Sequence, residues 1–211
     1  MGTIKQGILG GFSGKVGGVV GTSWKGIGIM KAMPLSVANP KTAAQVANRD
    51  RNTGVLRFAQ GVGTTLIRKY WNRFAKGMSG YNDFMSVNYD CYNPTTLIYT
   101  ASKMFTSVGK LLQQSITSLT LSGATNLVAN FPARTASSDY LVGDLVDVVF
   151  FNTTQGLGIT VENLAASATS ASVASPANWE VGDEVIAFLS TRRGDGTAVS
   201  TSVNMTGNLG A

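Results

Sequence analysis

The sequence predicts an α+β fold, in which a glycine-rich β arm and a helical region precede an all-β sandwich of the immunoglobulin or fibronectin type. Three observations predict it. Ten of the 25 glycines fall within the first 33 residues. Helical patterns dominate the middle of the chain, and short apolar segments separated by turn signals follow residue 100. We therefore divide the chain into an arm (1–38), a helical region (39–100) and a β-sandwich (101–211).

The arm alternates glycines with Ile, Val and Trp side chains. This pattern predicts short strands joined by glycine turns, with Ile27 and Ile29 alternating in the last strand. Such a segment is too small to build a core alone, so we expect it to add strands to neighbouring subunits or to pass between them. The residues that we expect to carry this assembly are Gly10, Gly11, Gly14, Gly17, Gly18 and Trp24.

The helical region has a start signal, a break and an apolar face. Asn39 and Pro40 predict its first residues, because Asn caps helices and Pro fits their first turn. Gly61 and Gly63 predict a break into two helices. A further short helix is predicted over 81–89. After the break comes a wide apolar face that we expect to be buried; it consists of Leu66, Ile67, Tyr70, Trp71 and Phe74.

Beyond residue 100 the pattern changes to β. Val142-Gly143-Asp144 and Val181-Gly182-Asp183 each precede an apolar segment, which predicts two equivalent turns. Seven short strands in succession predict a sandwich. The predicted strands cover 115–121, 126–131, 145–152, 157–161, 171–174, 184–191 and 198–206.

The charges are few and unevenly distributed. Charged residues make up 13% of the chain, whereas a soluble domain has about 25%, so we expect much of the surface to consist of Ser, Thr, Asn and Gly or to be covered by neighbours. Residues 1–110 hold 14 Lys and Arg against three Asp, a net charge of +11, and residues 111–211 hold three Arg against eight acids, a net charge of −5. The basic half is suited to nucleic acid or to the acidic half of the next copy.

The residue types argue against an enzyme. The chain has no His, and its one cysteine, Cys91, is expected to be a small buried residue. Ser-His and Cys-His catalysis, the usual zinc sites and an internal disulfide are therefore excluded. The glycine-rich start is no phosphate loop, because Leu9 and Val16 stand where that motif needs Gly and Ser or Thr. We expect no cofactor, no metal and no small-molecule substrate.

Cations alternate with aromatic residues after the predicted break, which is typical of nucleic-acid surfaces. The alternative is an amphipathic helix with buried aromatics and solvated cations, and we favour this alternative. Non-specific DNA contact stays open as a secondary role, because binding to phosphates requires only Lys and Arg. The residues that would make it are Arg68, Lys69, Arg73 and Lys76.

The acids of the second half are expected in turns and at strand ends, on the surface. Asp139, Asp144 and Asp147 lack the dense ligand loop of a calcium site. We expect that Asp144, Asp147 and Asp183 can be reversed to Lys without unfolding the sandwich. Arg193-Gly194-Asp195 matches a cell-adhesion tripeptide, but Asp195-Gly196 is an ordinary hairpin turn.

Nothing in the sequence predicts a membrane protein. Lys5, Lys15 and several glycines interrupt the start, so no signal peptide is expected. The longest charge-free stretch, 111–133, is rich in Ser, Thr, Gln and Asn and is not expected to span a bilayer.

The opening residues Gly2-Thr-Ile-Lys-Gln-Gly-Ile-Leu-Gly-Gly-Phe-Ser-Gly-Lys-Val-Gly17 and the later Trp24-Lys25-Gly26 resemble a family of uncharacterised proteins of Bacteroidota bacteria and their phages, with a GILGGFSGKVG-type motif. The helix start from Asn39 is similar to that of the family, and its C-terminal sandwich is similar to Trp179, Val185–Thr191 and the Asp195-Gly196 hairpin of this chain. The resemblance implies a virion protein, one of the ring proteins that stack below the portal in the neck and short tail of crAss-like phages. It carries over no catalytic residues.

Three hypotheses follow. The first is a phage structural protein that forms a closed homo-oligomeric ring, of about 12 copies if it continues the symmetry of the portal, with the portal and neighbouring neck and tail proteins as partners. The second is a DNA-binding structural protein that uses the basic half. The third is a surface or host-binding β-sandwich module. The first implies a location in the virion after synthesis in the bacterial host cytoplasm.

Overall fold

The structure is a computed structural model that describes residues 3–4, 11–24, 26–36, 39–122, 126–134 and 141–210. It has an α+β fold, with three α-helices and mostly β-strands in this described part. The chain divides into two compact units, Met1–Thr42 and Ala43–Ala211. We call them the N-terminal and the C-terminal unit.

The N-terminal unit is an antiparallel sheet of four strands in chain order, which confirms the predicted short strands and glycine turns. The strands are β1 (Thr3–Ile4), β2 (Phe12–Val16), β3 (Val19–Trp24) and β4 (Ile27–Ala32). Gly17 and Gly26 lie in the two hairpin turns with φ of 57° and 83°, a left-handed conformation that favours glycine. Among the described residues of this unit only Gly21 is buried, so this part of the sheet has no hydrophobic core.

The helices of the C-terminal unit are α1 (Ala43–Val62), α2 (Thr64–Trp71) and α3 (Gly80–Val87). Gly63 separates α1 from α2 with a φ of 85°, which confirms the predicted break. Ser79 caps α3, and its side chain accepts a hydrogen bond from the backbone N–H of Asn82 at 3.2 Å. The predicted start at Asn39 and Pro40 is wrong by one turn, because α1 begins at Ala43.

The strands of the C-terminal unit form two larger sheets and a small hairpin. One sheet has the order β10-β9-β12-β13, the other has the order β11-β8-β7, and β5 pairs with β6. The bounds are β5 (Tyr92–Asn93), β6 (Ile98–Tyr99), β7 (Ser118–Leu121), β8 (Asn126–Asn130), β9 (Leu145–Asn152), β10 (Leu157–Ala165), β11 (Ser170–Ala174), β12 (Glu184–Arg192) and β13 (Val203–Asn208). Short 3-10 turns cover Tyr89–Cys91 and Ala101–Lys103.

Each of the seven predicted segments contains part of an observed strand, and 145–152 coincides with β9. The last predicted segment, 198–206, is displaced from the observed strand. β13 begins at Val203, because Val199 and Ser200 make only isolated bridges.

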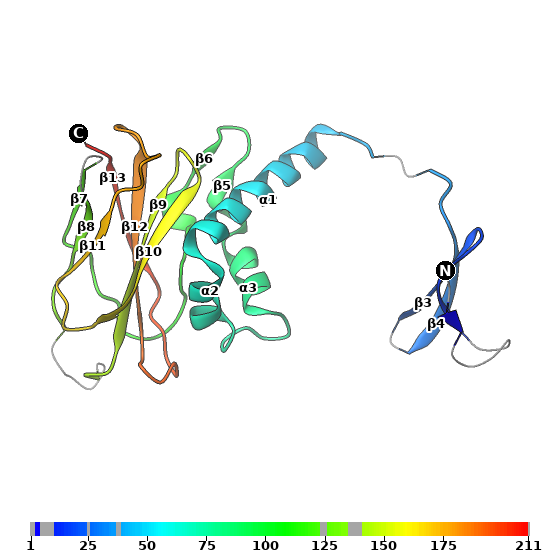
Figure 1. Ribbon diagram of the computed structural model, residues 1–211, viewed down its shortest axis with the longest axis horizontal. Helices are drawn as coiled ribbons and strands as arrows, with labels where there is room; N and C mark the ends of the chain where they lie inside the picture. The colour runs from blue at the N-terminus through cyan, green and yellow to red at the C-terminus, as the bar shows by residue number, and fades with distance from the viewer. Residues whose placement is uncertain are drawn as a thin grey trace. The chain divides into compact units, whose positions relative to one another are not determined.

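The C-terminal unit has three layers (Figure 1): the helices, the four-stranded sheet, and the three-stranded sheet. The central strands β9 and β12 are buried on both faces, which explains their nearly continuous apolar sequences. Val149 and Phe151 belong to the core with the helices, whereas Val148 and Phe150 belong to the core between the sheets. The compact unit thus continues across residue 100, where the sequence changes from helical to β patterns.

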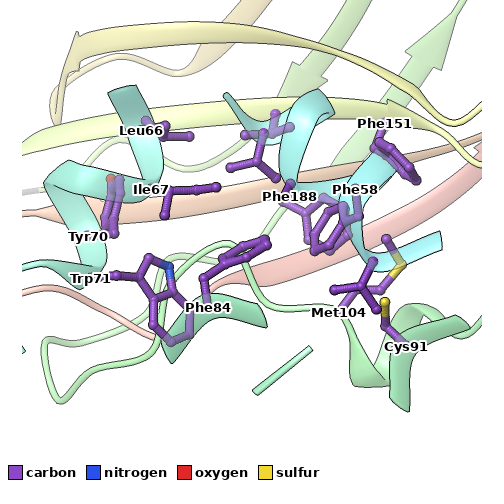
Figure 2. Close-up of a cluster of buried hydrophobic side chains, with 14 of the residues drawn as sticks. Phe58, Leu66, Ile67, Tyr70, Trp71, Phe84, Cys91, Met104, Phe151 and Phe188 are labelled. Carbon is purple, nitrogen blue, oxygen red and sulfur yellow. The ribbon is translucent and has the colours of Figure 1, made fainter. Parts of the chain in front are cut away.

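The helix-side core is rich in aromatic rings (Figure 2). Phe58 of α1 lies 5.1 Å from Phe151 and 5.5 Å from both Phe84 and Phe188, measured between ring centroids. Tyr70 is also fully buried, as predicted. The prediction that Phe74 is buried is wrong, because α2 ends at Trp71 and the Phe74 side chain is 38% exposed.

Candidate functional site

The structure places the glycines predicted for assembly in β2 and its turn. Gly10 lies outside the described residues. Gly11 is exposed and precedes β2, and Gly14 lies within β2 with a φ of 103°. Gly17 and Gly18 form the two-residue turn to β3, and a side chain added at either one would meet no neighbouring atom within 4 Å. Gly11, Gly17 and Gly18 therefore leave their backbone open to contact.

The same sheet exposes large apolar side chains. Trp24, the sixth predicted assembly residue, ends β3 and is 61% exposed, and all six residues of β4 are exposed. β4 is an edge strand. Residues 27–30 carry no charge, proline or register shift of the kind that protects edge strands from pairing. A sheet of this composition is a candidate protein–protein interface.

The four residues predicted to contact nucleic acid are not all available for such a contact. Lys69 pairs with Glu162 of β10, with Nζ 2.5 Å from Oε2. Arg68, Arg73 and Lys76 are exposed. The positive charge of this segment is therefore partly neutralised within the protein.

The aromatic residues among these cations are part of the core. Tyr70 is fully buried and Trp71 is 3% exposed. The indole Nε1 of Trp71 donates a hydrogen bond to the backbone oxygen of Thr106 at 2.9 Å. Neither ring is available to stack on a base, so the interpretation as an amphipathic helix is confirmed.

A buried polar network joins the helices to the sheet, and the sequence did not predict it. Its centre is Asp147 of β9, whose side chain has no exposed surface. One carboxylate oxygen accepts a hydrogen bond from the Tyr70 hydroxyl at 2.8 Å and one from Arg192 Nε at 3.1 Å. The other accepts from the backbone N–H of Asn163 at 2.5 Å. The network therefore ties α2, β9, β10 and β12 together.

The surroundings of Tyr70 keep its hydroxyl protonated. Burial raises the pKa of Tyr70 well above its ordinary value, and the Asp147 carboxylate raises it further. Tyr70 therefore stays protonated, and its hydroxyl donates a hydrogen bond to the carboxylate. Together with the Arg192 guanidinium it compensates for the removal of the Asp147 charge from water. A charged residue inside the apolar sequence of β9, and an arginine ending β12, were the only sequence signals of this site.

The acids expected on the surface are buried. Asp144, Asp147 and Asp183 are at most 8% exposed, because their carboxylates bind groups of the protein. The Asp144 carboxylate accepts from the N–H of Leu141 at 3.1 Å, and the Asp183 carboxylate accepts from the N–H of Glu180 at 3.0 Å. The two turns thus share these hydrogen bonds, as the prediction of equivalent turns requires, although Gly182 has a positive φ of 95° and Gly143 does not. The expectation that these acids lie on the surface is therefore wrong, and their burial argues against the expectation that they can be reversed to Lys without unfolding.

Two further aspartates were considered in the sequence, Asp139 and Asp195. Asp139 lies outside the described residues. Asp195 lies in the turn after β12, where its carboxylate accepts hydrogen bonds from the N–H and the hydroxyl of Thr197 at 2.8 and 2.7 Å. These hydrogen bonds lower the pKa of Asp195. This geometry is that of a hairpin turn, as predicted.

The described residues offer neither a membrane-spanning helix nor a metal site. No helix of the described segments is long and apolar enough to cross a membrane. The described residues contain no group of three or more His, Cys, Asp or Glu side chains that could hold a metal ion. Cys91 is a free, buried thiol, as expected, and burial raises its pKa to about 12.

The sequence of this chain matches one family of proteins. The sequence profile of a family of unknown function, DUF6266, matches residues 11–206. The chain belongs to the DUF6266 family. The match begins just before β2 and ends within β13, so it covers β2, β3 and β4 of the N-terminal sheet and nearly all of the C-terminal unit. No curated protein matches the chain.

Proposed function

We propose that this DUF6266 protein is a non-enzymatic structural protein of a tailed bacteriophage virion, and that it forms a closed homo-oligomeric ring in the neck or tail. The observation that carries the proposal is the N-terminal sheet. Its described residues expose Trp24, Ile27 and Met30 and bury only Gly21. A small sheet needs a covered apolar face for stability in water, and the described residues of this sheet provide almost none, so we infer that a neighbouring copy covers it.

The C-terminal unit suits the role of a rigid subunit body. We infer that its two sheets form an immunoglobulin-like sandwich of the fibronectin kind. The order β11-β8-β7 corresponds to strands E, B and A, and the order β10-β9-β12-β13 to strands C′, C, F and G. The helices cover the outer face of the second sheet, so side chains on both faces of β9 and β12 are buried.

The virion location rests on the resemblance of the opening residues to phage and Bacteroidota proteins with the GILGGFSGKVG-type motif. Under this proposal the portal and neighbouring neck and tail proteins are the partners. A closed ring is the natural product of head-to-tail contacts. An extended arm that reaches a neighbouring copy supplies such a contact.

DNA contact is the second candidate, and a specific observation supports it. Arg68, Arg73 and Lys76 are exposed near one another in the sequence. Because Lys69 is paired with Glu162, and Tyr70 and Trp71 are buried, the contact would be electrostatic and independent of sequence.

Mass photometry of the purified full chain tests the proposal. We expect one discrete species of many copies, which electron microscopy shows as a closed ring. A monomer at all concentrations from nanomolar to micromolar would contradict the ring. A monomer that binds any duplex, with an affinity that falls steeply as salt rises, would replace it with the second candidate.

A further inference from the structure

Three cations from distant parts of the sequence meet at the end of β12. Arg193 directly follows that strand, and Arg73 follows α2. The two turns lie at the same end of the C-terminal unit (Figure 1), and the Arg73 guanidinium donates a hydrogen bond to the backbone oxygen of Asp195 at 3.4 Å. Lys110 lines a hollow together with Arg193. The fold therefore gathers charges that the sequence keeps apart.

Backbone contacts hold Lys110 in this place. The N–H of Leu111 donates a hydrogen bond to the backbone oxygen of Val199 at 2.9 Å. A Cβ on Gly109 would collide with the backbone of Val199, so only glycine permits the two segments to approach this closely. The position of the Lys110 backbone beside Arg193 is therefore set by the fold.

Arg193 differs from its neighbour Arg192 in its lack of an acceptor. Arg192 Nε is bound by the buried carboxylate of Asp147 at 3.1 Å. Within the described residues the Arg193 side chain makes no ion pair or hydrogen bond, and its Nε is buried without a partner. An acceptor from outside the chain would therefore bind an arginine whose charge the protein leaves unpaired.

One carboxylate stands beside the two arginines. Hydrogen bonds from Thr197 lower the pKa of Asp195, and the charges of Arg73 and Arg193 lower it further. Both guanidinium groups thus act on the same carboxylate. With Lys110 as the third cation, the cluster keeps an excess of positive charge.

The hollow between Lys110 and Arg193 suits an anion that also has apolar atoms. Its volume is about 410 Å³, and Leu111, Leu112 and Ala198 complete its lining. The Leu112 side chain is 59% exposed. Cations of this kind bind phosphate oxygens, and an apolar wall can contact the carbon atoms of a sugar.

Charge argues against a second copy as the source of the anion. Residues 111–211 hold eight acids, but most of those described are buried or bound within the protein. The buried ones are Asp144, Asp147 and Asp183, and the bound ones are Glu162, Glu184 and Asp195. The described residues of this half therefore present few free carboxylates to a neighbour. A polyanion of another kind fits better, and duplex DNA carries one negative charge per about 1.7 Å of its axis.

We propose that Arg73, Lys110 and Arg193 form one site for the phosphate groups of duplex DNA. The inference rests on the second candidate function, DNA contact, and adds to it two residues outside the basic segment that follows Gly63. Because Tyr70 and Trp71 are buried, this site binds phosphates and stacks no base on either ring. Its binding is therefore independent of sequence.

The salt dependence of DNA binding by the full chain tests each residue. The logarithm of the binding constant falls with the logarithm of the salt concentration by about 0.9 for each phosphate neutralised. We expect Arg193→Gln and Lys110→Gln each to reduce this slope by about 1 for every chain in contact. Each should also weaken binding of a fluorescently labelled duplex by about fivefold or more.

Arg57→Gln is the matched control. Arg57 is exposed and lies beside Gly156, which follows the end of β9, whereas Arg193 adjoins the residue that pairs with Leu145 at the start of β9. The control thus removes a cation of the same kind from the opposite end of the sheet. It should leave the affinity and the slope unchanged. Melting curves from circular dichroism verify that all variants are folded.

The outcomes separate this inference from the functions proposed above. If Arg68→Gln and Lys76→Gln reduce the slope, but Arg193→Gln and Lys110→Gln behave like the control, this site is wrong and DNA contact through the basic segment stands. If the unaltered chain does not bind the duplex, both fail. Poly-glutamate that displaces the duplex at an equal concentration of charge would assign the site to an acidic protein and overturn the proposal. Mass photometry of the same variants reports on the ring separately.

Discussion

Both units contain an antiparallel β-sheet, but the sheet is covered in one unit and exposed in the other. In the C-terminal unit, the sheet that contains β9 and β12 is covered on one face by helices and on the other by a second sheet. In the N-terminal unit, β4 is equally regular, yet every one of its residues is exposed. Apolar strands thus occur in both units. Only the C-terminal unit itself contains the layers that cover its apolar strands. Because a sheet requires a covered face to be stable, the comparison predicts which unit folds by itself.

The largest effect should come from a charge placed in the covered sheet. Asp147→Lys would set a second cation beside Arg192 and leave the Tyr70 hydroxyl with only the Ser190 backbone oxygen as acceptor. We expect a loss of more than about 5 kcal/mol, enough to unfold a typical domain. Asp195→Lys, in an exposed turn, is the control and should change the melting temperature little. A folded Asp147→Lys protein in urea titration would show that the network does not support the sheet.

Two tryptophans sharpen the comparison. Trp71→Ala removes a buried ring that packs against Phe84 at 5.5 Å, and should cost about 3–5 kcal/mol of unfolding free energy. Trp24→Ala removes a ring that is 61% exposed in the N-terminal sheet, and should change the unfolding free energy of the C-terminal unit by less than about 0.5 kcal/mol. Chemical denaturation measures both. Equal losses would mean that the two units unfold as one.

The sequence predicted what depends on local signals. Glycine turns and apolar runs located the strands, and Gly63 located the helix break, because these features act within a few residues. The Asp147 network was missed because its partners Tyr70 and Arg192 lie 77 and 45 residues away. The burial of Asp183 was missed for a related reason, since a turn motif does not reveal that Asn152 from another strand also donates to it.

The candidate site was predictable only in part. The glycine spacing identified the N-terminal sheet, but its two faces appear only once the register pairs Val20 with Lys15 and Lys31. Likewise, the basic segment after Gly63 was visible in the sequence, whereas the pairing of Lys69 with Glu162 depends on the packing of α2 on β10.

High pH should act on the C-terminal unit alone. Burial raises the pKa of Cys91 from 9.0 to about 12 and raises the pKa of Tyr70 and Tyr99. These groups hold their protons more tightly when folded, so their stabilising contribution is complete below about pH 9 and falls as pH rises toward the folded pKa values. We expect a loss on the order of 1 kcal/mol at pH 10. Residues 1–42 contain no Tyr or Cys.

Melting curves between pH 7 and pH 10 measure this loss. Melting curves recorded at the same ionic strength at every pH separate this loss of stability from the effects of salt screening. Stability that stays constant to pH 10 would contradict the burial of these three groups.

Removal of residues 1–42 tests the central claim most directly. The boundary follows the compact units, and the C-terminal unit has both cores within itself. We predict that residues 43–211 are monomeric by mass photometry and melt cooperatively at the temperature of the same unit in the full chain, while the full chain assembles. A truncated protein that forms the same oligomer as the full chain, or one that does not fold, would contradict the account.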